Sequence, residues 1–454
     1  MMHPVIFRES DIRGVYEKDF DLSFAEDLGR SFFTYIKNTA KKESPTITIG
    51  MDARLSSPNI VNALTKGFTS SGGNVIQLGL ITTPISYFST FTMPQVDGAI
   101  MVTGSHNPPD YNGFKVSVGK RTINGPEIQE LKNILEKKDF STGAGKASTY
   151  DIFPEYVERY KKEFGDLSGV PVVLDCGNGA AGSIARRLYE ALNVDVQIIF
   201  EKPDGTFPNH HPDPTVEENN DDLKKQVLKH KAALGIGFDG DADRIGMITN
   251  TARFLLGDEI MTVFAKDILS KQPGAKIIGD VKCSDRMYQM ISKYGGNAIM
   301  WKTGHSLIKE KVKSEKAPFG GELSCHIFFA DRNYGYDDSL YAGLRMIEIL
   351  KTNKTTIEGL LEDYPEAFST PEIRIDTTEE KKTLIVQKMR EHYLNKKDIS
   401  LSEIDGVRAS YKNGWALVRS SNTQPVVSMR FEANTKQALE EIQSEAMKIV
   451  NAFL

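Results

Sequence analysis

The fold is decided by three short apolar runs, TITIG (46–50), NVIQLGL (74–80) and GAIMVT (98–103). The segment Pro58–Ser71, between the first two runs, has the periodicity of a helix. Strands separated by helices of this length indicate βαβ units and mostly parallel sheets. The third run leads directly into the loop GSHNP (104–108), and ligands bind at loops that follow the carboxyl ends of such strands.

Changes of composition divide the 454 residues into four parts. The segment 141–149 (STGAGKAST) is small and polar, as a linker is, and a softer break falls at 249–253. A third break lies near Pro365 and Pro371, after a helical stretch that begins at Ser339. We therefore predict an α/β protein whose domains surround a central cleft. The predicted domains are three α/β domains with mixed or parallel sheets, 1–148, 149–252 and 253–367, and a smaller α+β domain, 368–454.

The last of these domains differs from the others in its pattern. Trp415–Arg419 and Val426–Glu432 alternate like a pair of strands, and Thr435–Phe453 has the pattern of an amphipathic helix. Strands that pair directly, followed by a helix, are typical of an α+β domain.

Composition and charge exclude several classes of protein. Lys and Arg total 56 and Asp and Glu 61, a formal net charge of −5, so we expect neither nucleic acid nor an anionic membrane as a partner. We find no apolar signal core near the N-terminus and no window with the ~18 apolar residues of a membrane helix. Cys176, Cys283 and Cys325 are too few and too scattered for a disulfide framework or a Cys-rich zinc site. We therefore expect a cytoplasmic protein, with monomer and homodimer both open.

The octapeptide GFDGDADR (237–244) carries the first candidate site. Asp239, Asp241 and Asp243 alternate, so an extended segment would direct all three carboxylates to one side, where they repel one another unless a cation lies between them. Oxygen ligands favour Mg²⁺ or Ca²⁺, and an acidic turn exposed to solvent is the plainer alternative. An EF-hand is excluded, because Arg244 stands where that loop needs Gly. Arg244 either neutralises the carboxylates or binds a phosphate oxygen.

The segment TGSHNPPDYNGFK (103–115) carries the second candidate site. Ser105 leaves a strand abruptly, which fits a nucleophile, a phosphate carrier or a simple turn hydroxyl. A hydrolase elbow is excluded, because Thr103 and Asn107 stand where G-x-S-x-G needs Gly. The neighbouring His106 is a base or a structural hydrogen-bonding group. The proline pair 108–109 favours a preorganised site.

Two further loops have the chemistry of sugar and phosphate recognition. In GGELSCH (320–326), Glu322 and Ser324 offer an acceptor and a donor to neighbouring sugar hydroxyls, or form a capped turn. In RSSNTQP (419–425), an arginine and consecutive hydroxyl and amide side chains suit a phosphate, although the same residues are common in hairpin loops. Lys282 and His305 are smaller candidates, each just after a strand-like run.

These four loops, in this order, together with FRESDIRG (7–14), resemble the α-D-phosphohexomutase superfamily, and within it the bacterial phosphomannomutase/phosphoglucomutase branch. The resemblance spans the whole chain. It implies a phosphorylated serine, here Ser105, that donates its phosphoryl group to a hexose phosphate. A hexose 1,6-bisphosphate then turns around in the site and returns its other phosphate to the serine, so the same bisphosphate is the expected activator.

The resemblance also assigns roles residue by residue. Mg²⁺ would be held by Asp239, Asp241, Asp243 and the phosphorylated Ser105. Acid/base and charge-stabilising groups would be Arg13, Lys115 and His326, with Arg244 in contact with substrate; His106, next to the serine, completes the predicted catalytic set. The predicted substrate-binding residues are Lys282, His305, Glu322, Ser324, Arg419, Ser421, Asn422 and Thr423.

Two residues depart from the pattern of these relatives, and no role is assigned to either. Ser10 stands where they usually have an aromatic residue, and Cys325 replaces their usual Gly in the sugar loop. Mannose and glucose phosphates are the expected substrates, because GELSCH resembles the GEMSGH of dual-specificity enzymes. Gly104 and Leu323 argue against a phosphoglucosamine mutase, whose loops usually read ASHNP and GEQSGH. A metal-dependent sugar-phosphate phosphatase and a binding protein without turnover are the alternatives from other classes.

Overall fold

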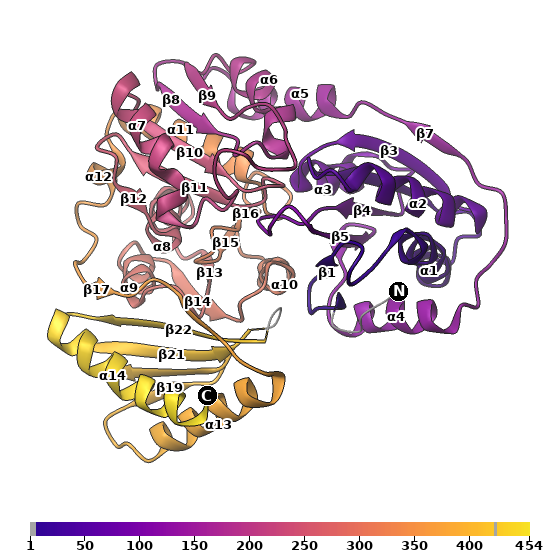
Figure 1. Cartoon of the computed structure of the whole chain (residues 1–454). Coiled ribbons are helices and arrows are strands. Elements are labelled where there is room, and N and C mark those ends of the chain that lie inside the picture. Colours follow the sequence, from indigo (N-terminus) through magenta and orange to yellow (C-terminus); the bar gives the residue numbers. More distant parts are fainter. Residues whose placement is uncertain (1–5, 422–424) are drawn as a thin grey trace.

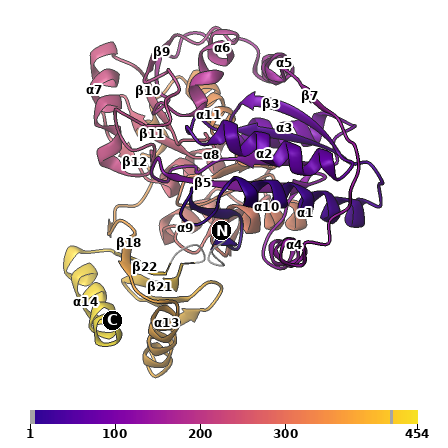
Figure 2. The ribbon, with the colours of Figure 1, turned by 45° about the vertical axis from the view of Figure 1, so that its right-hand side comes forward.

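The computed structural model describes residues 6–421 and 425–454, and within them the chain forms four sheets flanked by helices (Figure 1). Each sheet collects one continuous part of the chain. In both views the fourth sheet and its helices lie at the lower left of the molecule (Figure 2). The predicted α/β class is confirmed.

The first sheet has the order β1-β5-β4-β2-β3-β7, and β6 pairs with β5. β2 is parallel to β3 and β4, as the βαβ pattern predicts, whereas β5 runs antiparallel to β1 and β4. The strands are β1 (Ile12–Val15), β2 (Thr46–Met51), β3 (Asn74–Leu80), β4 (Gly98–Val102), β5 (Tyr111–Val118), β6 (Arg121–Thr122) and β7 (Ala147–Thr149). The helices are α1 (Leu22–Ala40), α2 (Ser57–Ser70), α3 (Thr83–Thr92) and α4 (Pro126–Lys137).

The second sheet has the order β12-β11-β10-β8-β9, with β9, β8 and β10 parallel. β10 is buried throughout, as a central strand covered on both faces should be. The strands are β8 (Val172–Asp175), β9 (Val196–Ile199), β10 (Leu234–Phe238), β11 (Ile245–Thr249) and β12 (Phe254–Leu255). The helices are α5 (Phe153–Phe164), α6 (Ala185–Glu190) and α7 (Asp221–His230), with short 3₁₀ helices at Ala180–Ser183 and Glu217–Asn220.

The third sheet, β14-β13-β15-β16, is parallel except for β16. Its strands are β13 (Lys276–Asp280), β14 (Asn297–Trp301), β15 (Phe319–Gly321) and β16 (Ile327–Phe329). Its helices are α8 (Gly257–Lys271), α9 (Asp285–Lys293), α10 (His305–Glu315), α11 (Ser339–Asn353) and α12 (Ile357–Leu360).

The fourth sheet, β17-β22-β21-β20-β19 with β18 also on β22, is antiparallel, and the predicted pairing of its two long strands is confirmed. Its strands are β17 (Phe368–Ser369), β18 (Ile373–Asp376), β19 (Ser400–Ser402), β20 (Val407–Tyr411), β21 (Gly414–Ser420) and β22 (Val426–Ala433). Its helices are α13 (Glu379–Leu394) and α14 (Lys436–Phe453).

Sheet pairing crosses two of the predicted domain boundaries by a few residues. β7, in the segment predicted to be a linker, pairs with β3 and adds a strand to the first sheet. β12, just after the predicted boundary at 252, pairs with β11 in the second sheet. The boundaries themselves stay a prediction.

One buried apolar cluster joins three of the domains, the first domain has a second cluster of its own, and a small cluster of Val281, Trp415 and Leu417 joins the third domain to the fourth. Phe88 of α3, Ile236 of β10 and Phe329 of β16 belong to one continuous buried cluster. The fourth domain has its own core, which includes Ile385 and Phe431. Among the described residues, no helix combines the length and the apolar character needed to cross a membrane.

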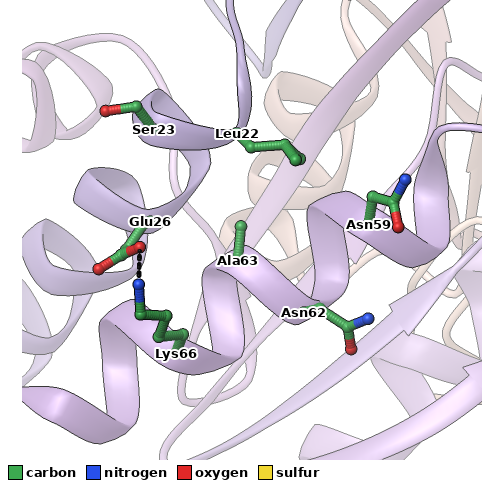
Figure 3. A pocket seen from close by; sticks show the side chains of 7 residues that line it. All are labelled: Leu22, Ser23, Glu26, Asn59, Asn62, Ala63 and Lys66. Carbon is green, nitrogen blue, oxygen red and sulfur yellow. Dashed lines mark hydrogen bonds and ion pairs between the residues drawn. The ribbon is translucent and has the colours of Figure 1, made fainter.

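Figure 3 shows a surface hollow between α1 and α2. Its polar groups include an ion pair from Lys66 Nζ to Glu26 Oε2, at 2.8 Å, and the amides of Asn59 and Asn62. We place no site there, because the lysine already has its carboxylate partner.

Candidate functional site

We call residues 103–111, from the end of β4 to the first residue of β5, the serine loop. It turns back at Ser105, whose φ is 50°, in the left-handed region that non-glycine residues seldom adopt. The amide N–H of Ser105 donates to Thr103 Oγ1 at 2.7 Å. The Ser105 hydroxyl is buried and donates to Asp239 Oδ2 at 2.9 Å, and His106 Nδ1 lies 3.2 Å from it. The serine therefore points at the aspartate turn of the second domain.

The three aspartates lie in the turn between β10 and β11, and all are fully buried. The segment is a tight turn rather than extended, with Ala242 at φ 59°, because the amides of Asp243 and Arg244 both donate to Asp239 Oδ1 at 3.0 Å. The expectation of an extended segment is therefore wrong in backbone conformation. The carboxylates of Asp239, Asp241 and Asp243 still converge, with one oxygen of each within 4.8 Å of the others.

Two observations fit this turn to a cation. Asp241 Oδ1 and Asp243 Oδ1 are buried and have no hydrogen-bond partner among the described residues. Burial and the two neighbouring carboxylates raise the pKa of Asp239 well above its usual range, which shows how strongly the uncompensated charges repel. Oxygen ligands of this kind suit Mg²⁺.

Lys115, on β5, partly compensates these charges. Its Nζ is buried, lies 3.2 Å from Asp241 Oδ2 and makes a closer contact with Asp243. Burial alone would lower the pKa of Lys115, but the two aspartates raise it well above its usual range, so the side chain stays charged. Thr83, at the start of α3, also donates to Asp241 Oδ2, at 2.6 Å. We call Ser105, Lys115 and the three aspartates the transfer centre.

The remaining predicted catalytic groups surround the transfer centre. Arg13, on β1, donates to Asn107 Oδ1 at 2.7 Å and pairs with Asp11. Burial, followed by the positive charges of Arg244 and Arg13, lowers the pKa of His106 well below its usual range. His106 is therefore a neutral imidazole.

His326 links the transfer centre to the third domain. Arg244 Nε donates to His326 Nε2 at 3.0 Å, and His326 Nδ1 donates to Asp337 Oδ2 at 3.0 Å. The two partners fix a neutral tautomer with its proton on Nδ1. The ring of His305 stacks on His326 with centroids 5.6 Å apart, and burial lowers the pKa of His305 well below its usual range.

The sugar loop lies between β15 and β16. Glu322 is buried, accepts from the Gly304 amide at 2.7 Å, and has a pKa raised chiefly by burial. Ser324 is half-buried. Both ring nitrogens of His305 are buried without a hydrogen-bond partner among the described residues. The hydrogen bond to Gly304, the residue before His305, brings Glu322 to the start of α10.

The predicted phosphate-binding residues lie at the junction of the third and fourth domains. Lys282 Nζ contacts Glu372 Oε2 at 3.2 Å. Arg419, at the end of β21, pairs with Asp405 Oδ2 at 2.9 Å, and that same oxygen accepts from the Thr303 amide at 3.0 Å. We call Lys282, Arg419 and Ser421 the recognition side. Ser421 is buried, whereas the predictions for Asn422 and Thr423 fall outside the described residues.

Three carboxylates in these networks escaped the sequence reasoning, namely Asp337, Glu372 and Asp405. Glu372 lies 90 residues from Lys282, whereas Asp337 and Asp405 lie 11 and 14 residues from His326 and Arg419, still beyond the span of a short motif. The only signal was Asp405-Gly406, which predicts a turn and nothing more.

The two departures also have local explanations. Ser10 Oγ lies 2.7 Å from Ser306 Oγ, so it links the first and third domains. Cys325 has φ 63°, a conformation that favours glycine.

The chain was compared with known protein families, and four models match it in order. Their descriptions are phosphoglucomutase/phosphomannomutase alpha/beta/alpha domain I (4–142), domain II (154–252) and domain III (256–368), and the C-terminal domain (372–449). Together these matches cover most of the chain.

Individual relatives are similar to this chain over almost its full length. A phosphomannomutase/phosphoglucomutase of Pseudomonas aeruginosa is 42% identical over 439 residues, which are 97% of this chain and 94% of that protein. A phosphoglucomutase of Neisseria meningitidis is 38% identical over 450 residues, 98% of this chain and 97% of the relative. The crystal structure of a phosphoglucomutase/phosphomannomutase family protein from Burkholderia thailandensis superposes with a TM-score of 0.92 at 39% identity, covering 100% of this chain and 98% of that one.

Proposed function

The chain belongs to the phosphoglucomutase/phosphomannomutase family, and on this premise we propose that it interconverts hexose 1-phosphates and hexose 6-phosphates, with mannose and glucose phosphates as substrates. The observation that carries the proposal is the hydrogen bond from Ser105 Oγ to Asp239 Oδ2, 2.9 Å long, between residues 134 positions apart in the sequence. A hydroxyl held against a converging set of carboxylates suits a phosphoryl carrier beside a cation.

In the proposed cycle Ser105 begins phosphorylated. A hydroxyl oxygen of the bound sugar phosphate attacks the phosphorus, the Ser105 Oγ–P bond breaks, and the sugar becomes a 1,6-bisphosphate. The bisphosphate turns around, and Ser105 Oγ takes the other phosphoryl group. A free hexose 1,6-bisphosphate loads the serine in the same way, so we propose it as the activator.

The surrounding side chains divide the remaining work. Asp239, Asp241, Asp243 and the phosphorylated serine would hold Mg²⁺, which supplies charge neutralisation to the phosphoryl oxygens when bound. Lys115, Arg13 and Arg244 stabilise the negative charge around the serine. His326 accepts the proton of the attacking hydroxyl at Nε2, which must first give up the hydrogen bond from Arg244 Nε, and returns the proton to the leaving oxygen.

Recognition of the sugar phosphate falls to groups on the third and fourth domains. Glu322, Ser324 and His305 contact the hydroxyls, and Lys282, Arg419 and Ser421, with Asn422 and Thr423, hold the phosphate that is not being transferred. A phosphate held at one place lets the same transfer centre serve both ends of the sugar. We keep the cytoplasm as the proposed compartment, because all three cysteines are unpaired and buried.

A paired assay tests the proposal. Purified protein with Mg²⁺ and a trace of glucose 1,6-bisphosphate should convert glucose 1-phosphate to glucose 6-phosphate, and mannose 1-phosphate likewise, while released inorganic phosphate is measured in the same samples. Steady phosphate release without isomerisation would indicate a phosphatase instead. Turnover of glucosamine 6-phosphate alone would move the assignment to a phosphoglucosamine mutase, and binding without any product would contradict an enzyme.

A further inference from the structure

Arg54 lies in the loop between β2 and α2, and its side chain is completely buried beneath the serine loop. Its guanidinium donates to the carbonyl oxygens of Ser105 at 2.8 Å, Asn107 at 2.6 Å and Tyr111 at 2.9 Å. It also donates to the carbonyl oxygen of Pro108. One side chain from outside the loop thus binds four of its carbonyl oxygens.

The fifth donor of Arg54 binds Asp52. Arg54 Nε donates to Asp52 Oδ2 at 3.1 Å, and that oxygen also accepts from the Gly104 amide at 3.0 Å. The other oxygen of Asp52 accepts from Ser57 Oγ at 2.8 Å. All five N–H groups of the guanidinium therefore have acceptors, and four of the five are backbone atoms of the serine loop.

The loop is confined from both sides. A Cβ on Gly104 would come within 2.4 Å of Arg54 Cζ, so the backbone there rests directly on the guanidinium. A Cβ on Gly240, in the aspartate turn, would come within 2.4 Å of the Ser105 carbonyl oxygen. The backbone of Ser105 is thus held between Arg54 and the aspartate turn.

This confinement stabilises the unusual backbone conformation of Ser105. A left-handed conformation at a non-glycine residue is strained and persists only where its surroundings hold it. Ser105 has φ 50°, and this conformation directs its hydroxyl at Asp239. The hydrogen bond from Arg54 to the Ser105 carbonyl acts on the same residue.

We propose that Arg54 is a positioning residue for phosphoryl transfer, which holds Ser105 in its left-handed conformation at the aspartate turn through hydrogen bonds to the serine loop. The inference rests on the proposed function and deepens it. Arg54 acts through the backbone of Ser105. Lysine cannot replace it, because an ammonium has three donors on one atom and lacks the planar fork.

The test compares Arg54→Met and Arg54→Lys with a matched control, Arg345→Met. Arg345, on α11, is equally buried and pairs with Asp331, far from the serine loop in sequence and outside the transfer centre. Three quantities are measured for each variant: kcat for glucose phosphate isomerisation, the equilibrium dissociation constant for glucose 6-phosphate, and the melting temperature. Wild-type protein is assayed first, so absence of isomerisation there contradicts the proposed function rather than the role of Arg54.

We expect Arg54→Met to lower kcat by ~100-fold, the usual effect of a small misplacement of a reacting group, with the dissociation constant within about threefold of wild type. Arg54→Lys should lower kcat by at least ~10-fold, although it keeps the charge, because most of the loop contacts are lost. Arg345→Met should lower the melting temperature but leave kcat within about threefold.

Four results would overturn the inference. The first is a folded Arg54→Met protein with kcat within threefold of wild type, and the second is full rescue of kcat by lysine. The third is an equal loss of kcat in Arg345→Met, and the fourth is the failure of both Arg54 variants to fold, since either would reduce Arg54 to a stability residue.

Discussion

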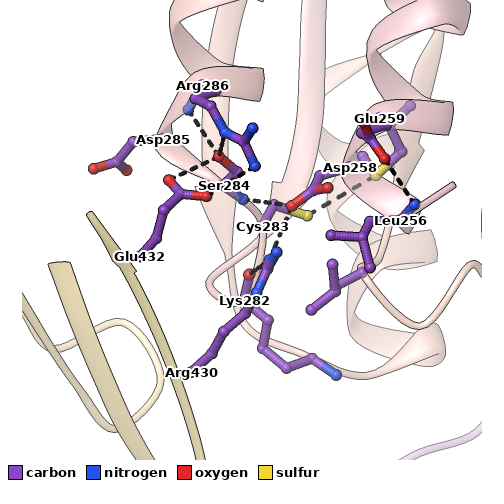
Figure 4. A network of polar contacts seen from close by, with 12 residues as sticks. Leu256, Asp258, Glu259, Lys282, Cys283, Ser284, Asp285, Arg286, Arg430 and Glu432 are labelled. Atoms are coloured by element: carbon purple, nitrogen blue, oxygen red, sulfur yellow. Dashed lines mark hydrogen bonds and ion pairs between the residues drawn. The ribbon is translucent and has the colours of Figure 1, made fainter. Parts of the chain in front are cut away.

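The transfer centre and the recognition side are built in different ways. The transfer centre joins the first and second domains by buried contacts, and an apolar core runs through the first three domains around it. The fourth domain has its own core and meets the third through a small apolar cluster of Val281, Trp415 and Leu417 and through polar contacts. Figure 4 shows one group of these, in which Arg430 pairs with Asp258 at 2.9 Å and Ser284 donates to Glu432 at 2.8 Å.

This difference in construction suits different tasks: the transfer centre keeps its atoms in fixed positions, whereas the recognition side contains ion pairs that can be replaced. Phosphoryl transfer needs fixed reacting atoms, and a continuous core resists displacement. The cations of the recognition side are instead paired with internal carboxylates, Lys282 with Glu372 and Arg419 with Asp405. Under the proposed function, a substrate phosphate would compete with these carboxylates, so we expect the recognition side to exchange partners while the transfer centre keeps its own.

Loss of the serine hydroxyl should have the largest effect. Ser105→Ala is expected to lower turnover by at least ~100-fold while sugar-phosphate binding changes little, because only the transfer centre loses a group. Ser89→Ala, which alters a buried serine on α3, is the matched control. Turnover near that of the wild type in Ser105→Ala would remove the serine from the mechanism.

Removal of divalent metal should have the second-largest effect on turnover. Chelation with EDTA is expected to lower turnover on the order of 100-fold, and added Mg²⁺ should restore it. Because the metal would relieve repulsion among three buried carboxylates, Mg²⁺ should also raise the melting temperature of the wild type. The Asp241→Asn variant should show a smaller rise. An unchanged melting temperature in every sample would contradict a cation at this turn.

A substitution on the recognition side should lower activity less than the loss of Ser105 or of the metal, and it should act on kcat/KM rather than on kcat alone. Lys282→Met is expected to lower kcat/KM for glucose 1-phosphate by ~10-fold, while loading of the serine by the bisphosphate continues. Lys293→Met, an exposed lysine paired with Asp363, serves as the control. A loss confined to kcat, with KM unchanged, would place Lys282 in the transfer centre and break the comparison.

The contact between Lys282 and Glu372 should have the smallest effect on turnover, and we expect it in the pH dependence of stability. Burial alone would raise the pKa of Glu372, but pairing with Lys282 and a hydrogen bond from Ser428 lower it to about 2. The stabilisation is therefore present above the usual glutamate pKa and lost as the pH falls toward 2, and it amounts to at most about 3 kcal/mol.

Glu372→Gln tests this directly. Denaturant unfolding from pH 7 down to the acid limit should show a variant that is less stable than the wild type at neutral pH, with the two converging in acid. Curves that stay parallel over this range would show that the ionised Glu372 contributes nothing.

Sequence reasoning indicates candidate site residues where a loop follows directly from the end of a strand. Ser105 and the three aspartates each come just after a buried strand, so their local pattern predicted a site, and the structure brings the two loops together. It was wrong about the backbone of the aspartate turn, because hydrogen bonds from two amides to Asp239 fold the segment, and alternation alone cannot indicate them.

The sequence did not indicate the side-chain partners that come from distant parts of the chain. Glu372 lies 90 residues from Lys282, and neither neighbourhood marks the pair. Arg54 resembles any charged residue before a helix, although it is completely buried. Such partners follow from how domains pack together, and local periodicity contains no record of that packing.

The most direct test of the central claim is to locate the phosphoryl group itself. Wild-type protein incubated with Mg²⁺ and glucose 1,6-bisphosphate, then digested and mapped by mass spectrometry, should carry phosphate on Ser105. The phosphate on Ser105 should disappear when a large excess of glucose 6-phosphate is added, because the sugar phosphate accepts the phosphoryl group and becomes the bisphosphate. Phosphate on another residue, or none while isomerisation proceeds, would contradict the account.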